Sequence, residues 1–296
     1  MPQAGEPHAS LRERVIGEQG VVMIVGAGDT GKTTLAKLLM ADALGAGKSV
    51  ALVDADLGRS TVGPPACVGL KWVRSPDDFS VLHEADELRF VGSTQPQGVV
   101  LPHVVAAAAL VEVARAGADF VVLDTTGVVS GVVGQTIKYH LMELCAPSLV
   151  VAMQRGREME PTIGMLERFL GARVARSAPH AELIPQGPVE QRAGRIEAFR
   201  RALAPPLPRW RVQPSVFAPT LPDGFDLKRL HGMLVGVQDD AGRCLGLGAL
   251  EHAEHSLVVA THHGEVMRGL RLGSLRIDLD SYDTTRLRLR QLSFGI

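Results

Sequence analysis

Asparagine does not occur anywhere in this chain of 296 residues, and cysteine, tryptophan and tyrosine are nearly as scarce. Without asparagine the chain cannot contain the Asn-Lys-x-Asp motif with which ordinary GTPases select guanine. Its three cysteines, Cys67, Cys145 and Cys244, are far apart and form no Cys-x-x-Cys pair. We therefore expect them to be small core residues in a reducing cytosol.

The chain also lacks an excess of charge of either sign, because its formal net charge is −1. This balance argues against a protein whose whole surface binds nucleic acid, although it allows a local basic groove. No basic-then-apolar leader is present, and no apolar run approaches the length of a membrane span. We therefore expect a cytoplasmic protein that does not use a membrane.

A phosphate-binding motif lies near the start of the chain. Residues 26–33 read Gly-Ala-Gly-Asp-Thr-Gly-Lys-Thr, between an apolar run at residues 21–25 and a helix-like stretch at residues 34–40. In that setting the pattern G-x-x-x-x-G-K-T is typical of a P-loop that binds a nucleoside triphosphate. Lys32 is expected to reach the β- and γ-phosphates, and the Thr33 hydroxyl to ligate Mg²⁺. The residues that we expect to hold the nucleotide are Gly28, Asp29, Thr30, Gly31, Lys32, Thr33 and Thr34.

Strand-like and helix-like segments alternate between residues 20 and about 175. The predicted strands, at residues 21–25, 49–53, 88–91, 120–123 and 149–153, are continuous apolar runs, which is typical of parallel strands buried on both faces. Helical stretches at residues 101–116 and 135–144 separate some of them. The pattern predicts an α/β fold of the P-loop NTPase class, a doubly wound parallel sheet with helices on both faces.

The chain divides into three parts by composition. Residues 1–19 are polar and are predicted to form an N-terminal arm, and residues 20–205 form the P-loop domain with an arginine-rich segment at residues 186–203. Six prolines follow between residues 205 and 222, and short β-like segments with turns come after them. We expect residues 206–296 to form a small, mostly β domain that includes a hairpin around residues 239–242.

Two carboxylates follow the second predicted strand, in the sequence Asp54-Ala55-Asp56-Leu57-Gly58-Arg59. Acids at the carboxyl end of a strand in this fold lie beside the P-loop ligand. Alternation along an extended chain predicts that Asp54 and Asp56 point to the same side. We expect both to serve Mg²⁺ and Asp56 to accept a proton from an attacking hydroxyl.

These motifs, in this order, resemble the Clp1/Grc3 family of polynucleotide 5′-hydroxyl kinases, particularly its short archaeal-type members. The similar segments are Asp54-x-Asp56-x-Gly58 with the nearby Pro64-Pro65, residues 90–98 (Phe-Val-Gly-Ser-Thr-Gln-Pro-Gln-Gly), and residues 124–128 (Asp-Thr-Thr-Gly-Val). The chain departs from the family pattern at Arg59, where a glutamine is usual, and at Val128, where a tryptophan is usual.

The resemblance implies an enzyme that uses ATP and Mg²⁺ to phosphorylate the 5′-hydroxyl end of RNA or DNA, in single-stranded form. It implies substrate contacts at Arg59, Gln95, Thr125 and Thr126. Val128 cannot stack on a base as tryptophan does, so base contact must be weaker or come from elsewhere. The resemblance names no protein partner for this chain.

Arginines are concentrated in the segment at residues 189–201. Arg192 and Arg195 are three positions apart and share one face of a helix. Phosphoryl-transfer enzymes often close a lid whose arginines neutralise the moving phosphoryl group, and the resemblance implies such a lid here. The alternative is a solvated helix face on which the arginines pair with Glu190 and Glu197.

Other functions stay open at this point. Partitioning ATPases carry a signature lysine early in the P-loop, where this chain has Ala27. A small-metabolite kinase, and an ATP-binding scaffold of RNA processing with weak or no activity, remain the alternatives to a polynucleotide kinase.

Arg286, Arg288 and Arg290 alternate along a predicted strand and give one basic face. That face either follows a nucleic-acid backbone or is a solvated edge.

Overall fold

The computed structural model describes residues 9–179, 183–222, 224–253 and 256–287. Arg288 and Arg290 lie outside these residues. In the N-terminal part the elements are α1 (Ala9–Ile16), β1 (Gly20–Gly26), α2 (Lys32–Gly45), β2 (Val50–Ala55), β3 (Cys67–Val73), β4 (Glu87–Phe90), α3 (Val100–Gly117), β5 (Phe120–Thr125), α4 (Gly131–Cys145), β6 (Leu149–Met153), α5 (Glu160–Leu170) and β7 (Val174–Ser177). They are followed by α6 (Pro188–Ala202), β8 (Arg209–Val212), β9 (Met233–Gln238), β10 (Cys244–Ala253), β11 (Ser256–Ala260), β12 (Gly269–Ile277) and β13 (Thr284–Arg286).

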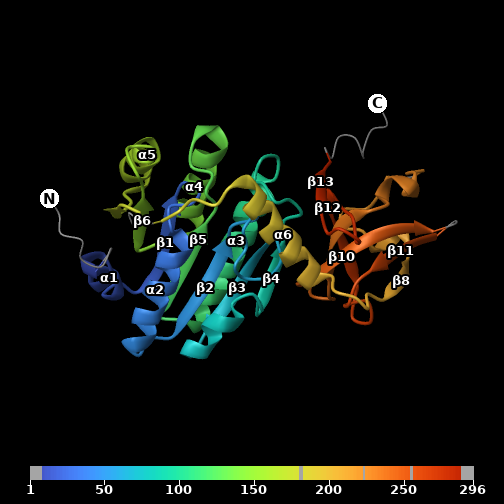
Figure 1. Cartoon of the computed structure of the whole chain (residues 1–296), viewed down its shortest axis with the longest axis horizontal. Coiled ribbons are helices and arrows are strands. Elements are labelled where there is room, and N and C mark those ends of the chain that lie inside the picture. The colour runs from blue at the N-terminus through green and yellow to red at the C-terminus, as the bar shows by residue number, and fades with distance from the viewer. Residues whose placement is uncertain (1–8, 180–182, 223, 254–255, 288–296) are drawn as a thin grey trace.

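Five strands form the parallel part of the sheet, in the order β2-β5-β1-β6-β7. Their order differs from their order in the chain because the intervening helices carry the chain across the sheet (Figure 1). All five strands end at the same edge, where ligands bind in open α/β sheets. The P-loop follows β1 and the two acids follow β2, so the fold brings both motifs to that edge.

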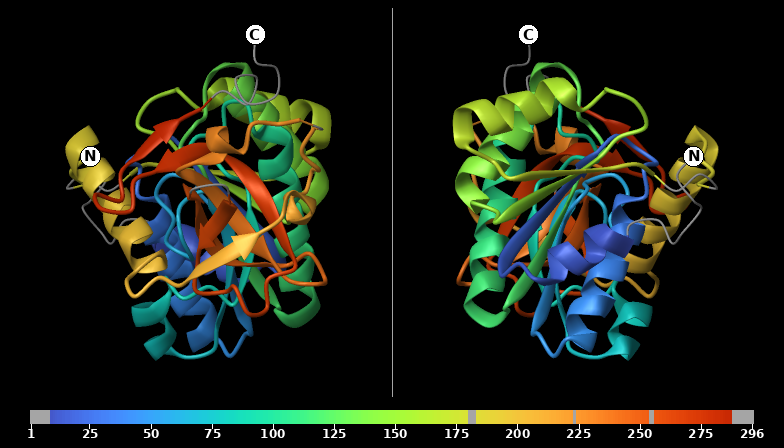
Figure 2. Two further views of the ribbon diagram at one scale, coloured as in Figure 1. Left: turned by 90° about the vertical axis from the view of Figure 1, so that its right-hand side faces the viewer. Right: turned by 90° about the vertical axis from the view of Figure 1, so that its left-hand side faces the viewer.

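Both faces of the parallel strands are covered, as Figure 2 shows from either end of the molecule. Along β1, Val21, Met23 and Val25 pack into a core with residues of α3, α4 and α5. The alternate residues Val22 and Ile24 pack on the other face, against α2. A strand buried on both faces needs an uninterrupted apolar run, and the sequence 21–25 supplies it. The predicted doubly wound P-loop fold is therefore confirmed.

The sheet departs from the sequence prediction at both sides: the parallel edge strand β7 was not predicted, and the other side differs more. The segment at 88–91 was expected to be a parallel strand, but β4 pairs antiparallel with β3 and with β10. β3, which pairs antiparallel with β2, was not predicted. Its sequence includes Gly69, Lys71 and Trp72, so it is not a continuous apolar run, and Lys71 forms an ion pair with Asp86 at 3.6 Å.

The C-terminal strands continue the same sheet. The predicted hairpin is present, because β9 and β10 pair antiparallel across the turn that contains Gly242. β10 then joins the N-terminal part through the Cys244–Leu88 pair. The contact is close: a Cβ atom on Gly236 of β9 would lie 2.4 Å from the Phe90 ring, so a larger residue does not fit there. A shared core under α6 includes Phe199, and it unites residues on both sides of the proline-rich break.

Two helices differ from what the sequence suggested. Residues 9–16, assigned to a polar arm, form α1, in which Val15 is fully buried and Arg12 binds Asp42 of α2 through two hydrogen bonds of 2.5 and 2.6 Å.

Among the described residues, α3 alone is long and apolar enough by composition to cross a membrane, contrary to our expectation. It packs as a core helix, with Leu110 and Ala114 fully buried against the sheet.

A buried histidine on α3 fixes the end of β2. The His103 side chain is fully buried, and its Nε2–H donates to the carbonyl oxygen of Ala55 at 2.8 Å. Its Nδ1 atom is buried and has no hydrogen-bond partner in the described part of the chain. Burial is the main reason that the pKa of His103 falls to about 4. The neutral ring therefore holds the residue that precedes Asp56.

The pKa of His103 gives a pH-dependent prediction. Between pH 6.5 and 4 the unfolded chain binds a proton at this residue and the folded protein does not, so stability falls as the pH falls. The loss amounts to about 3 kcal/mol over this range. The variant His103→Gln keeps an N–H donor for Ala55 and does not titrate. We expect the free energy of unfolding of the wild type, measured with urea, to fall relative to that of His103→Gln between pH 6.5 and 4.

The exposed residue His262 offers a matched control. His262→Gln should follow the wild-type curve. Parallel curves for the wild type and His103→Gln across this pH range would contradict the assignment of a neutral buried ring.

Candidate active site

The P-loop follows β1 and wraps the start of α2. Gly31 precedes α2 with a φ of 84°, and Asp29 adopts a φ of 57°, so the loop bends through two left-handed residues. The buried Lys32 amine donates to the Ala27 carbonyl at 2.8 Å, and Thr30 Oγ1 donates to the same oxygen at 2.9 Å. Burial lowers the pKa of Lys32, and the charge of Asp124 partly opposes this. The amine therefore sits inside the loop, at the place where a phosphate chain would bind.

A cavity of about 330 Å³, here named the P-loop cavity, lies over this loop. The segment after β7 and the loop after β2 close it from two sides. Its lining residues are Asp29, Gly31, Lys32, Thr33, Thr34, Asp56, Arg59, Thr61, Leu183, Ile184 and Gln186. Most of the nucleotide-binding residues predicted from the sequence therefore line one cavity, together with Asp56 and Arg59.

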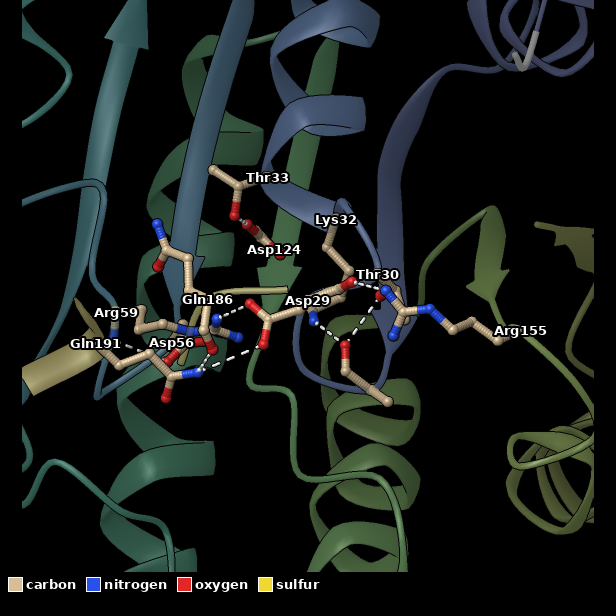
Figure 3. Close-up of polar contacts among 11 residues, drawn as sticks. Asp29, Thr30, Lys32, Thr33, Asp56, Arg59, Asp124, Arg155, Gln186 and Gln191 are labelled. Carbon is tan, nitrogen blue, oxygen red and sulfur yellow. Dashed lines mark hydrogen bonds and ion pairs between the residues drawn. The ribbon is translucent and has the colours of Figure 1, made fainter. Parts of the chain in front are cut away.

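Asp29 is the meeting point of side chains from three other segments (Figure 3). Its carboxylate forms an ion pair with Arg59, from the loop after β2, and accepts a hydrogen bond from Gln191 Nε2 of α6 at 3.4 Å. Its carbonyl oxygen accepts from Arg155, which follows β6, at 2.5 Å. Two arginines and an amide donor thus surround the middle of the P-loop, and they are positioned to meet the negative charge of a bound phosphate.

Thr33 and Asp124 face each other across the site (Figure 3). Thr33 Oγ1 donates to Asp124 Oδ2 at 2.7 Å, while Asp124 Oδ1 is buried without a partner in the described residues. Burial raises the pKa of Asp124, and Lys32 opposes that rise. An unpaired carboxylate oxygen beside a hydroxyl is a donor set suited to a hard cation such as Mg²⁺. Asp124 was missed as a site residue, although it lies at the end of a buried apolar strand as Asp54 does.

One carboxylate oxygen of Asp56 is held by hydrogen bonds, and the other is free of them in the described part of the chain. Asp56 Oδ1 accepts from the main-chain N–H groups of Gly58 at 3.0 Å and Arg59 at 3.1 Å. Within the described part of the chain, Oδ2 has no hydrogen-bond partner, and the residue lines the P-loop cavity. The turn leaves no room for a larger residue at Gly58, where a Cβ atom would lie 2.9 Å from the Thr94 carbonyl oxygen. The carboxylate is therefore held in one orientation beside the P-loop.

Asp54 does not fit the metal-ligand role that we predicted. Its Oδ1 accepts from the Asp56 N–H at 2.9 Å, and its Oδ2 accepts from the N–H groups of Thr61 at 2.5 Å and Val62 at 3.0 Å. The side chain is buried, and burial beside Asp124 raises the pKa of Asp54 to about 8. Strand β2 ends at Ala55, so alternation does not extend to Asp56 and the two acids differ in environment. Asp54 therefore stabilises the loop after β2, and its oxygens are not available to a ligand.

Thr125 also departs from its prediction as a substrate contact. Its hydroxyl donates to the Ile24 carbonyl at 2.7 Å and accepts from the Lys138 amine at 2.8 Å. Lys138, which is fully buried, also donates to the Thr126 carbonyl at 2.8 Å, and burial lowers the pKa of Lys138 to about 7. Both groups therefore hold the end of β5 from inside. The buried Thr126 packs in the same loop, where a Cβ on Gly127 would lie 2.8 Å from the Gly28 nitrogen.

The predicted lid arginines lie outside the P-loop cavity. Arg192 and Arg195 do share one face of α6, as their spacing predicted, but that face lines a second cavity together with Gln95. Arg192 forms an ion pair with Asp283, so neither Glu190 nor Glu197 is its partner. Gln191, the neighbour of Arg192, is the residue of α6 that reaches the P-loop. Its role was not predicted, since nothing in the sequence sets it apart from other polar residues on the helix.

Comparison with known proteins agrees with this geometry. Residues 26–201 match the family model described as the P-loop of the mRNA cleavage and polyadenylation factor CLP1. A polyribonucleotide 5′-hydroxyl-kinase of Pyrococcus furiosus is 25% identical over 93% of this chain and 86% of its own length. The corresponding kinase of Pyrococcus horikoshii is 26% identical over 94% of this chain and 90% of its own length.

Solved structures support the fold. Clp1p in a complex with Pcf11p superposes with a TM-score of 0.69 over 90% of this chain and 77% of that one, at 14% identity. At that identity the likeness concerns the fold alone. It covers the C-terminal strands as well as the P-loop part, because 90% of the chain is included.

The position of Lys32 leads to a prediction for nucleotide binding. Replacing Lys32 with alanine removes the buried amine that faces the phosphate chain, so affinity for a fluorescent ATP analogue should fall at least about ten-fold, or about 1.4 kcal/mol. Fluorescence titration measures this directly. Lys37→Ala, which removes an exposed lysine from the same helix, is the matched control and should bind like the wild type. Equal affinity for Lys32→Ala and Lys37→Ala would contradict the placement of the triphosphate.

Proposed function

Because the chain belongs to the Clp1 P-loop family, we propose that it is a polynucleotide 5′-hydroxyl kinase, which transfers the γ-phosphate of ATP to the 5′-hydroxyl end of RNA or DNA. The family implies the use of ATP. The full-length similarity to two archaeal polyribonucleotide 5′-hydroxyl-kinases supports the choice of acceptor.

One observation carries this proposal. Asp56, a carboxylate with one unpaired oxygen among the described residues, lines the same cavity as the P-loop residues Lys32 and Thr33. A protein that only hydrolyses or senses ATP needs to position a water molecule, whereas a kinase needs a base beside an entry path for a hydroxyl. Asp56 lines the P-loop cavity itself, so a hydroxyl that enters this cavity can reach the carboxylate.

The reaction follows from these positions. The acceptor 5′-hydroxyl lies against Asp56 Oδ2, which takes the proton as the oxygen attacks the γ-phosphorus. A new P–O bond forms to the 5′ oxygen, and the bond to the oxygen that bridges the β- and γ-phosphorus breaks, so that ADP leaves with that electron pair. The two hydrogen bonds to Oδ1 keep the base oriented throughout.

Positive groups meet the charge of the transition state. Lys32 exchanges the Ala27 carbonyl for phosphate oxygens, and Arg59 lies over the P-loop where it can leave Asp29 for the γ-phosphoryl group. An arginine at this position binds phosphate directly, which a glutamine does through weaker, uncharged hydrogen bonds.

Mg²⁺ fits the donor set formed by Thr33 Oγ1 and the unpaired Asp124 Oδ1. Within the described residues no group of three or more histidine, cysteine or acidic side chains forms a metal cage. Such an ion therefore needs phosphate oxygens and water to complete its shell, which is the usual habit of Mg²⁺. When bound, it neutralises charge on the β- and γ-phosphates.

The acceptor reaction is tested with γ-labelled ATP and oligonucleotides that carry a 5′-hydroxyl, in RNA and DNA form. The purified protein should place the label on the 5′ end of at least one of them. If neither the RNA nor the DNA oligonucleotide is labelled, the result contradicts the proposal. Asp56→Ala should lower the transfer rate at least about 100-fold, the usual contribution of a general base, while ATP affinity stays near that of the wild type.

Asp77→Ala removes an acid on the surface outside the site and is the control for Asp56→Ala. Normal transfer by folded Asp56→Ala would exclude Asp56 as the base.

The metal assignment is tested by comparing two buried acids. Asp124→Asn should raise the Mg²⁺ concentration needed for half-maximal transfer at least about ten-fold, because it removes the charge of a ligand. Asp54→Asn should lower the maximal rate, because its amide N–H faces a main-chain N–H and loosens the loop, but it should leave this concentration nearly unchanged, since both Asp54 oxygens already accept main-chain N–H groups and neither is open to the ion. A titration of rate against Mg²⁺ gives both values. A larger shift for Asp54→Asn than for Asp124→Asn would reverse the assignment.

A further inference from the structure

A lysine is buried in the core beneath the carboxyl edge of the parallel strands. Lys138 lies on α4, and its side chain is fully buried. Burial of an amine in an apolar core is costly unless its N–H groups are hydrogen-bonded. The amine donates to Thr125 Oγ1 and to the Thr126 carbonyl oxygen, both at 2.8 Å. These two hydrogen bonds compensate for burial, and they connect α4 to the end of β5.

The hydrogen bond to Thr126 sets the orientation of the peptide group that joins Thr126 to Gly127. This peptide group is trans and planar, so its C=O and its N–H point in opposite directions. Because the Thr126 carbonyl points to Lys138 in the core, the N–H of Gly127 points away from the core. Within the ranges that the structure describes, this N–H has no hydrogen-bond partner. The lysine therefore turns a free main-chain donor outward.

Gly127 lies against the P-loop. A Cβ atom on Gly127 would lie 2.8 Å from the main-chain nitrogen of Gly28 and 3.4 Å from the carbonyl carbon of Ala27. The carbonyl oxygen of Ala27 accepts a hydrogen bond from the Lys32 amine at 2.8 Å. The outward N–H of Gly127 is therefore close to the amine that faces the phosphate chain.

The strand order places Gly127 between the two sides of the proposed reaction. β5 lies between β2 and β1, and Gly127 follows β5. Asp56 follows β2 on one side, and the P-loop with Lys32 follows β1 on the other. A phosphoryl group that passes from ATP to a hydroxyl at Asp56 moves across this position. A main-chain N–H held there can donate to a phosphate oxygen and stabilise charge that develops in the transition state.

We propose that the main-chain N–H of Gly127 donates a hydrogen bond to the γ-phosphoryl group, and that Lys138 is the positioning residue that turns this N–H toward it. The inference rests on the proposed kinase function. Lys138 acts from behind the peptide group and does not contact the nucleotide. Thr162 of α5 supports the same loop, because its Oγ1 donates to the Val129 carbonyl at 3.1 Å. ATP gains the contact with Gly127, whereas ADP, which has no γ-phosphate, does not.

The experiment compares the binding of ADP with that of the non-hydrolysable ATP analogue AMP-PNP, by calorimetry with Mg²⁺ present. Lys138→Met removes both hydrogen bonds and leaves a side chain of similar length. It should weaken AMP-PNP binding at least about ten-fold relative to ADP binding, because only the analogue has a γ-phosphate. Lys71→Met removes another buried lysine, on β3 and outside the P-loop cavity, and is the matched control. It should keep the wild-type ratio of the two affinities.

Two further variants separate peptide orientation from the charge of the lysine and from loosening of the core. Lys138→Gln has no charge but can still donate to the Thr126 carbonyl, so the ratio should partly recover relative to Lys138→Met. Thr125→Val leaves the hydrogen bond between Lys138 and Thr126 in place and should keep the wild-type ratio. Equal losses in Lys138→Gln and Lys138→Met would mean a charge effect alone and would overturn the role of Lys138. A loss of the same size in Thr125→Val would overturn it as well.

The N–H itself is removed when glycolic acid replaces glycine at position 127 during translation, because an ester then replaces the amide. The ester variant should bind ADP like the wild type and AMP-PNP at least about ten-fold more weakly. Wild-type affinity for AMP-PNP would overturn the inference, and the kinase proposal would stand if the wild type labels an oligonucleotide. These binding measurements need no acceptor. If the wild type labels no oligonucleotide but the ester variant loses affinity for AMP-PNP, the kinase proposal fails and the γ-phosphate contact stands.

Discussion

The site depends on one constraint: charged side chains are buried where the parallel strands end, and each must find a partner there. The register of β2 and β5 places Asp54 opposite Asp124, and Lys32 and Lys138 are buried nearby. Uncompensated burial of such groups is costly, so their partners decide what they can do. Asp54 is satisfied by main-chain N–H groups and Lys138 by Thr125 and Thr126, whereas Asp124 keeps one oxygen without a partner among the described residues. The hydrogen-bond partners therefore distinguish Asp54 and Lys138, which have structural roles, from Asp124, which can bind a ligand.

Helix α6 links the P-loop to the C-terminal strands. It passes from the carboxyl edge of the parallel strands to the C-terminal strands, as Figure 1 shows. Phe199 anchors it in the shared core, while Gln191 reaches the P-loop and Arg192 reaches Asp283. Successive residues of one helix thus contact both cavities.

The sequence predicted the P-loop, the four central parallel strands and the hairpin because each of these depends on a local pattern, whereas the short edge strand β7 was missed. The strand order near β3 and β4 was not predictable in the same way, since β3 contains Lys71 and Trp72 and is stabilised by its neighbours. The role of a residue was even harder to predict where it depends on a partner that is distant in the chain. Asp54 and Asp56 look alike in sequence, and only the loop at residues 58–62 distinguishes them. The pairing of Arg192 with Asp283 joins residues 91 positions apart.

The central claim is that the P-loop cavity holds the two halves of one phosphoryl-transfer site, the triphosphate on the P-loop and the acceptor hydroxyl at Asp56. The most direct measurement is the affinity for a bisubstrate analogue in which adenosine tetraphosphate is joined to the 5′ oxygen of a dinucleotide. The account predicts binding much tighter than that of ATP or the free dinucleotide, because both halves are occupied at once and the second costs little extra entropy. Binding no tighter than that of ATP alone would contradict it.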